Sequence, residues 1–255
     1  WQHIAYAAQL RHKRQIVVEQ LTRLGGLTDP LVHPMIQSPS PWYYRNHIQF
    51  HLHPNGQLGF MAARTNRVVP ITECHILEPQ VEALWHELQL DFPELREVAL
   101  RVGVNTGERL VLLQADSDEA PAAEVDSPVS LTLQLNDGRL IVLAGDAVYH
   151  ETLRGQRFQI SAPSFFQVNT PQAESMIQSV CEALALTGTE SVLDAYCGVG
   201  TFALSLAQQA RQVIGIESDP FAASDAQANA AGCANVRIVE GTVEDILPTL
   251  TEKFD

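Results

Sequence analysis

The fold of the C-terminal part is decided by the stretch Ser191-Val-Leu-Asp194-Ala-Tyr196-Cys197-Gly198-Val-Gly200-Thr201-Phe-Ala203. A short apolar run ends in an acid, a glycine turn follows, and a helix-forming run begins. Glycine in such a turn lets the backbone approach a ligand that a side chain would block. The stretch therefore predicts a strand, a ligand-binding loop and a helix in succession.

Strands and helices alternate on both sides of this loop. We predict a helix that Thr170-Pro171 caps, a strand at 191–195, a helix at 201–210, a strand at 212–217, a helix at 219–231 and a strand at 235–239. This alternation is typical of parallel β-α-β units with helices on both faces of the sheet. The predicted fold class is α/β, with an incomplete Rossmann-like domain over residues 161–255.

Residues 1–160 show a different pattern, which predicts a mixed, mainly β domain. A helix is expected over residues 2–24, with Gly25-Gly26 as its stop. Pro54-Asn55-Gly56 predicts a hairpin turn. Further strands are predicted at 97–103, 108–115, 128–135, 139–143 and 156–160, with one helix near 78–90 and a loop at 117–127. The domain boundary is expected near residues 160–170.

Composition points to an ordinary globular protein, with 45% apolar and 18% charged residues. No uncharged apolar run is long enough for a membrane span, and no signal peptide is visible. The four cysteines lie far apart without a CxxC pair, which favours a reducing compartment over a disulfide framework. We therefore expect a cytoplasmic protein without a membrane partner.

The charge is unevenly distributed. The net charge of −14 argues against a nucleic-acid partner, but residues 1–70 carry seven Lys and Arg against two Asp and Glu. Such a basic front could contact phosphates while the acidic remainder keeps the protein soluble. A chance excess on a solvated face is the alternative.

Two cofactors fit the glycine loop. Gly198-x-Gly200-x-x-Ala203 satisfies the dinucleotide fingerprint, and Glu217 ends the next strand where an acid accepts both ribose hydroxyls. Asp194, however, precedes the first glycine by four residues and would repel a pyrophosphate. It suits a cationic group such as the amino end of S-adenosylmethionine, directly or through the loop. The pattern favours S-adenosylmethionine over NAD; a tight turn without a ligand is the third possibility.

Further residues carry a family resemblance. Ser161-Ala-Pro-Ser-Phe-Phe-Gln167-Val-Asn169-Thr170, then Gln172-Ala-Glu174 and the Asp194–Phe202 loop, resemble the bacterial RNA 5-methyluridine methyltransferases, in particular the 23S rRNA (uracil-5-)-methyltransferases. The Phe-Gln-Val-Asn element is the specific part, because general methyltransferases lack it. The resemblance spans nearly the whole chain and is strongest over 161–245. It implies a class I methyltransferase fold, a monomer, and a front domain that helps to hold 23S rRNA.

The resemblance also implies roles for single residues. Gln167 and Tyr196 match cofactor contacts, and Glu217 matches the ribose-binding acid. Thr201 matches a cofactor-contacting position at which many members have asparagine, and either Glu244 or Asp245 meets the adenine. With the loop residues, the expected cofactor-binding set is Gln167, Asp194, Tyr196, Gly198, Gly200, Thr201, Glu217 and Glu244.

In the resembling family, a cysteine thiolate adds to C6 of uracil, C5 takes the methyl group, and a base removes the C5 proton. These residues lie beyond a downstream Asp-Pro-Pro-Arg segment. We therefore expect a chain truncated at both ends and inactive by itself, with the nucleophile and base downstream of Asp255. Cys197 matches a position that shapes the loop.

Two features of the front part have open interpretations. Cys74 resembles the fourth ligand of a [4Fe–4S] cluster whose other ligands would lie upstream of Trp1; a buried structural cysteine is the alternative. The aromatic side chains of residues 42–44 beside Arg45 could stack on single-stranded RNA or belong to the core. The rival functions are a methyltransferase for another substrate, an NAD-dependent oxidoreductase and an RNA-binding remnant without turnover.

Overall fold

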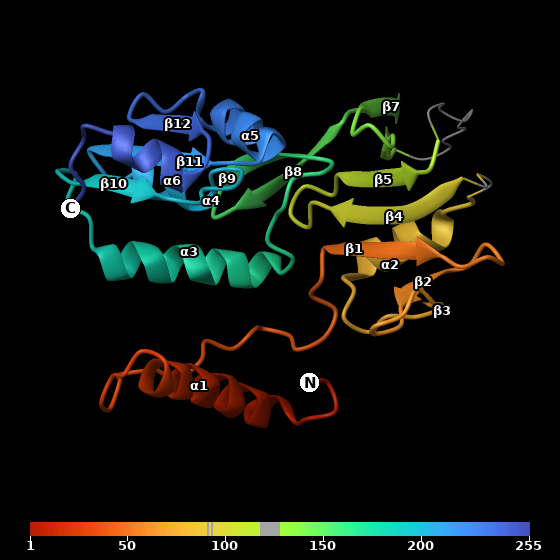
Figure 1. Ribbon diagram of the computed structural model, residues 1–255, viewed down its shortest axis with the longest axis horizontal. Coiled ribbons are helices and arrows are strands. Elements are labelled where there is room, and N and C mark those ends of the chain that lie inside the picture. Colours follow the sequence, from red (N-terminus) through yellow and green to blue (C-terminus); the bar gives the residue numbers. More distant parts are fainter. Residues whose placement is uncertain (91, 93, 118–127) are drawn as a thin grey trace. The chain divides into compact units, whose positions relative to one another are not determined.

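A computed structural model describes residues 1–90, 92, 94–117 and 128–255 (Figure 1). The chain divides into two compact units, Trp1–Pro41 and Trp42–Asp255. The loop predicted at 117–127 lies, apart from Ser117, outside the described residues. In the described part of the chain, no helix combines the length and apolar character that crossing a membrane requires.

The first unit is built on helix α1 (Tyr6–Arg23), which confirms the helix predicted over 2–24. Gly26 adopts a left-handed φ of +66°, so the predicted glycine stop ends the helix. The Tyr6 hydroxyl accepts the backbone N–H of Ser38 at 2.7 Å, and the Arg14 side chain donates to the Val32 carbonyl at 2.9 Å. These bonds fold the proline-rich segment back onto the helix.

The second unit begins with a seven-stranded sheet in the order β3-β2-β1-β4-β5-β6-β7. All neighbouring pairs are antiparallel except β5 and β6, which are parallel. Helix α2 (Pro79–Glu87) packs on β4 and buries Leu84 and Trp85 in the core of the sheet. The strands are β1 (His47–Leu52), β2 (Leu58–Met61), β3 (Val68–Pro70), β4 (Leu95–Val102), β5 (Arg109–Ala115), β6 (Ser130–Gln134) and β7 (Leu140–Ala144).

A separate hairpin of β8 (Val148–Leu153) and β9 (Gln156–Ser161) follows. Strand β9 was predicted from its pattern, but β8 was not. The buried face of β8 carries Tyr149, Glu151 and Leu153, so a charged residue interrupts the alternation of apolar and polar residues that indicates a strand. Glu151 is fully buried and accepts the backbone N–H groups of Val104 and Asn105 at 2.8 and 3.0 Å.

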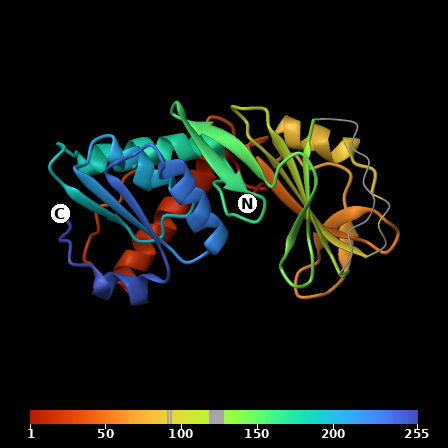
Figure 2. The ribbon, with the colours of Figure 1, turned by 90° about the horizontal axis from the view of Figure 1, so that it is seen from above.

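The C-terminal part forms the predicted α/β fold. Strands β10, β11 and β12 are parallel and lie side by side in this order (Figures 1 and 2). The elements are α3 (Thr170–Leu184), β10 (Ser191–Asp194), α4 (Thr201–Ala207), β11 (Gln212–Glu217), α5 (Pro220–Ala230), β12 (Val236–Glu240), α6 (Val243–Ile246) and a 3₁₀ turn (Leu247–Thr249). Helices α4 and α5 both pack on β11, which is buried from Val213 to Ile216.

One local prediction was wrong. The side chain that caps α3 is that of Asn169, which accepts the Gln172 backbone N–H at 3.1 Å. Thr170 is the first helical residue, and its hydroxyl instead donates to Glu151 at 2.9 Å. The hairpin strand β9 packs against α5, so contacts cross the region of the expected domain boundary. The boundary between residues 160 and 161 stays a prediction.

Candidate functional site

The two glycines of the loop between β10 and α4 have different surroundings. Gly200 is the N-cap of α4 with φ +89°, and a Cβ there would lie 2.3 Å from Leu204 Cδ1. Gly198 has φ +54°, and a Cβ there would meet nothing within 4 Å. A side chain at Gly200 would therefore have to displace the end of the buried Leu204 side chain, whereas Gly198 faces open space in which a ligand can approach the backbone.

Glu217, at the end of β11, reaches this loop. Its Oε2 accepts the Gly198 backbone N–H at 2.8 Å, and its Oε1 accepts the Asp219 backbone N–H at 2.8 Å. The structure thus joins two residues that the sequence analysis assigned to one site. Each carboxylate oxygen keeps a lone pair beyond the one already used, so the group can still accept hydrogen bonds from hydroxyls.

Asp194, at the end of β10, lies at the base of the same loop. Its Oδ2 accepts the Ala203 backbone N–H at 3.0 Å and so caps α4, whose N-cap Gly200 has no side chain. Burial raises the pKa of Asp194, and the negative charge of Glu217 raises it further, although hydrogen bonds from the Ala203 and Tyr196 backbones oppose this. No ion pair joins Asp194 or Glu217 to a basic side chain among the residues that the structure describes. The loop therefore lies between two carboxylates without a cationic partner.

The side chains expected to contact a cofactor differ in how accessible they are to a ligand. Tyr196 is 73% exposed although it lies within the loop. Gln167 is half-buried, and within the described part of the chain its side-chain amide makes no hydrogen bond. Thr201 is buried as the first residue of α4, which limits what its hydroxyl can reach.

The two acids expected near the adenine differ in their contacts. Asp245 belongs to the cap of α6: its backbone N–H donates to the Thr242 hydroxyl at 3.2 Å, and that hydroxyl donates to the Asp245 carboxylate at 2.8 Å. Glu244 is exposed and takes no part in this cap. The geometry therefore leaves Glu244 as the freer of the two carboxylates.

Cys197 is unsuited to nucleophilic chemistry. It is 4% exposed, and its sulfur fills the space above Gly215, where a Cβ would lie 2.9 Å from Sγ. Burial, together with the charges of Asp194 and Glu217, raises the pKa of Cys197 to about 12. A thiol with this pKa stays protonated at neutral pH. These contacts support the loop-shaping role that the sequence implied.

Cys74 is half-buried and packs against the core of the seven-stranded sheet. Among the described residues, no group of three or more His, Cys, Asp and Glu side chains could hold a metal ion. The residues present therefore do not complete a cluster site, and the role of Cys74 as one of four ligands stays a prediction.

A cavity of about 590 Å³ lies beside β10. Its wall is mostly apolar and comes largely from α3, β10 and α4, with Glu190, Asp194 and Asp255 as polar members. Asp255 meets the edge of β10: its backbone N–H donates to the Ser191 carbonyl at 3.1 Å, and its carboxylate accepts the Ser191 N–H at 2.9 Å.

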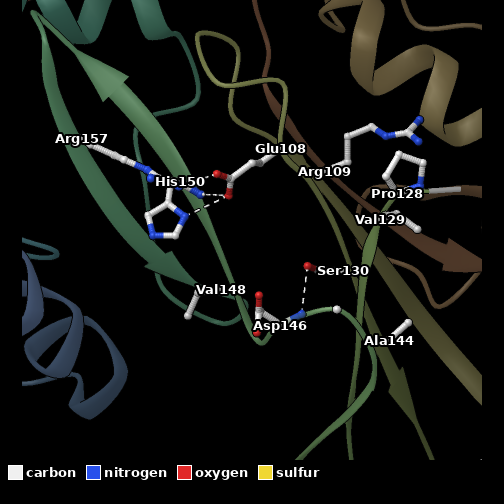
Figure 3. Close-up of a pocket in the computed structure, with 11 residues that line it drawn as sticks. Glu108, Arg109, Pro128, Val129, Ser130, Ala144, Asp146, Val148, His150 and Arg157 are labelled. Atoms are coloured by element: carbon white, nitrogen blue, oxygen red, sulfur yellow. Dashed lines mark hydrogen bonds and ion pairs between the residues drawn. The ribbon is translucent and has the colours of Figure 1, made fainter.

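A second cavity, of about 500 Å³, lies between the sheet and the β8–β9 hairpin and contains no predicted site residue (Figure 3). Glu108 lines this cavity and binds the Arg157 guanidinium at 2.7 Å and His150 Nδ1 at 2.9 Å. Burial raises the pKa of Glu108, but its bonds to His150 and Arg157 outweigh burial and lower the pKa overall. Arg109 is paired with Glu87 at 2.8 Å. Because these charges are already paired, the cavity offers little to a phosphate.

Sequence reasoning missed Asn46 and Asp225, two buried polar residues that bind the segment Ser161–Thr170. Asp225 carried a weak signal, since it is the one acid in the alanine-rich α5. Asn46 carried none, because it contacts residues more than 120 positions away in the chain.

The comparisons with known proteins agree with this fold. Residues 135–254 match the family described as tRNA (Uracil-5-)-methyltransferase. An uncharacterized RNA methyltransferase of Halalkalibacterium halodurans is 36% identical over 286 residues and covers 97% of this chain. One of Synechocystis sp. is 32% identical over 289 residues and covers 99%. The chain spans 62% of the length of each relative.

A solved structure is similar over the whole chain. The Pyrococcus abyssi tRNA (uracil-54, C5)-methyltransferase, in complex with S-adenosyl-L-homocysteine, is 25% identical with a TM-score of 0.75. The match covers 100% of this chain and 67% of that one. Sequence and fold therefore agree that the chain belongs to the tRNA (uracil-5-)-methyltransferase family.

Proposed function

We propose that this chain binds S-adenosylmethionine at the carboxyl ends of β10 and β11, as the cofactor-binding part of an enzyme that methylates C5 of a uridine in RNA. The observation that carries the proposal is the open space above Gly198 between Asp194 and Glu217. Open α/β sheets bind ligands outside the carboxyl ends of their strands. The Pyrococcus abyssi relative, crystallised with S-adenosyl-L-homocysteine, supports the same cofactor class.

Each proposed residue has a role that its geometry permits. Glu217 accepts the ribose hydroxyls with the lone pairs left free by Gly198 and Asp219. Asp194 gives the base of the loop its negative charge and favours the cationic methionine end. Gln167 and Tyr196 supply an unpaired amide and an exposed ring, and Glu244 rather than Asp245 meets the adenine.

Electrostatics favours this cofactor over NAD. A pyrophosphate would bring negative charge to a loop that already lies between two carboxylates. At about 4 Å, each like-charge pair costs roughly 1 kcal/mol in water and about 4 kcal/mol near a protein surface. The sulfonium and the amino group of S-adenosylmethionine are positively charged, so their interaction with the two carboxylates is favourable.

We favour 23S rRNA as the substrate, because the Phe166–Asn169 element and the loop resemble that branch of the family. Transfer RNA is the second candidate, since the matched family and the Pyrococcus abyssi relative are both described as tRNA enzymes. Full-length protein incubated with each RNA and S-adenosylmethionine, followed by mass spectrometry of the nucleosides, distinguishes the two. 5-Methyluridine in tRNA but not in 23S rRNA would overturn our choice.

The chain by itself binds the cofactor without transferring the methyl group. Attack on C6 of uracil requires a thiolate, and the one cysteine in the cofactor loop, Cys197, is buried with a pKa of about 12. Incubation of the chain with radiolabelled S-adenosylmethionine and either RNA is expected to leave the RNA unlabelled. Incorporation of label into uridine would contradict this.

Titration calorimetry with S-adenosylhomocysteine and with NADH tests the cofactor assignment. We expect binding of S-adenosylhomocysteine only, and a loss of about tenfold or more in Glu217→Ala, since a charged hydrogen-bond acceptor contributes about 1.5–3 kcal/mol. Glu240→Ala is the matched control, because Glu240 is the exposed register partner of Glu217 at the end of β12. Preferential binding of NADH, or equal affinities of the two variants, would contradict the assignment.

A further inference from the structure

The segment Ser161–Thr170, which carries Gln167, is held from both sides by buried polar side chains. We infer that Asn46 and Asp225 are positioning residues that hold this segment ready for the cofactor. The inference rests on the proposed function, because it concerns the wall of the same site. Neither residue is placed in contact with the cofactor.

Asp225 holds the first half of the segment from helix α5. It is fully buried, and its carboxylate accepts the Ser161 N–H, the Ser161 hydroxyl and the Ser164 hydroxyl, each at 2.7 Å. A fourth donor is the Gln159 amide at 3.1 Å. A buried carboxylate is costly unless it is hydrogen-bonded, and here the donors include three from the segment itself. Asp225 thus supplies three of the bonds that hold residues 161–164, beside the buried Arg101 guanidinium, which donates to the Ser164 carbonyl, and the Ala162 N–H, which donates to the Ala147 carbonyl at 2.8 Å.

One turn further along the same helix, Asn229 connects strand β9, which leads into the segment, to the glycine loop. Its amide donates to the Gln159 carbonyl and to the Val199 carbonyl, both at 3.0 Å, and its oxygen accepts the Gln159 N–H at 2.7 Å. Val199 lies between the two loop glycines. Helix α5 thus sets the segment and the glycine loop relative to each other.

Asn46, the residue immediately before β1, holds the second half of the segment. It is 2% exposed, and its side-chain amide donates to the Gln167 carbonyl and to the Thr170 hydroxyl, both at 3.0 Å. Its backbone N–H donates to the Val168 carbonyl at 2.9 Å. The main chain at Gln167 is therefore fixed, while the Gln167 side-chain amide has no partner in the described part of the chain.

A fixed backbone that presents an unpaired amide is the arrangement expected of a preorganised ligand contact. The residues between β9 and α3 have no regular secondary structure of their own, so side-chain bonds add to the few backbone bonds that hold them. If one of the two anchors, Asn46 and Asp225, is removed, the segment becomes mobile and must be ordered again when the cofactor binds. Ordering one residue weakens binding by about tenfold.

The test compares S-adenosylhomocysteine affinity in the wild-type chain with that in Asn46→Ala and Asp225→Asn. Leu84→Ala is the control: Leu84 is 1% exposed in the core between α2 and the sheet, so its loss lowers stability without touching the segment. We expect about tenfold weaker binding in the two anchor variants and unchanged affinity in the control. If the first two variants fail to fold, Ser164→Ala and Thr170→Val take their place in the test. Each removes one hydroxyl and should cause a smaller loss of S-adenosylhomocysteine affinity.

Hydrogen–deuterium exchange of the peptide 161–170 separates positioning from general destabilisation. Exchange in the unliganded chain should rise in the anchor variants and stay at the wild-type level in Leu84→Ala. If exchange rises but affinity does not change, or if the control loses as much affinity, the inference is wrong. If the wild-type chain itself does not bind S-adenosylhomocysteine, the proposed function fails instead, and the exchange data still report whether the anchors hold the segment.

Discussion

Replacing Gly198 by alanine separates the backbone requirement of the loop from its role in binding. In the unliganded chain the new Cβ would meet nothing within 4 Å, so the only penalty is the left-handed φ of +54°. For a residue with a side chain this conformation costs roughly 1–2 kcal/mol. For about 200 residues, each kcal/mol lowers the melting temperature by roughly 2–4 °C.

A matched glycine provides the control. Gly138, in the turn between β6 and β7, has φ +84°, and a Cβ there would also meet nothing within 4 Å. Gly138→Ala should therefore lose a similar amount of stability. The two positions differ in that Gly198 lies beside Glu217, at the proposed cofactor site, and Gly138 does not.

The predicted difference is in ligand affinity. A methyl group above Gly198 occupies space that the cofactor needs, so Gly198→Ala should bind S-adenosylhomocysteine at least about tenfold more weakly, which corresponds to about 1.4 kcal/mol. Gly138→Ala should bind like the wild type. Thermal unfolding and calorimetry, each with and without ligand, measure both quantities. Equal affinities in the two variants would refute the reasoning, and so would a stability loss in Gly198→Ala far above that of the control.

Three further predictions concern titrating groups. Asp194→Asn should not lower the free energy of unfolding at pH 7, because the raised pKa of Asp194 means that its negative charge destabilises the fold at this pH. In the wild type this penalty disappears as the pH falls and Asp194 becomes protonated. The Asp194→Asn variant should nevertheless bind S-adenosylhomocysteine more weakly than the wild type. Urea unfolding at pH 7 and pH 4, with calorimetry, tests both statements. Cys197 should resist iodoacetamide at pH 8 until the chain is unfolded, since its pKa is about 12, and peptide mass spectrometry would reveal any early modification. The lowered pKa of Glu108 stabilises the fold above the ordinary value of 4.5, so Glu108→Gln should be less stable than the wild type at pH 7, with the difference shrinking as the pH falls below that value. A difference in urea unfolding that stays constant from pH 7 to pH 3 would argue against this.

Several elements followed from local patterns. The alternation of strands and helices after residue 170, and the glycine loop between Asp194 and Thr201, depend on neighbouring residues in the chain, and the structure confirms both. The hairpin at Pro54-Asn55-Gly56 was predictable for the same reason. Strand β8 was missed because Glu151 is buried on its apolar face, where its partners Val104 and Asn105 come from a distant turn.

The cofactor loop could be read from the chain because its glycines, its acid and the strand before it lie within a dozen residues, and backbone conformation is a local property. The contacts that hold the segment 161–170 could not be predicted in this way, because Asn46 and Asp225 bind it across sequence separations of 121 and 64 residues. Which buried polar groups satisfy one another depends on how the sheet, hairpin and helices pack, because burial removes the water that would otherwise bind them. The tertiary structure therefore determines which side chains hold the Gln167 backbone in place.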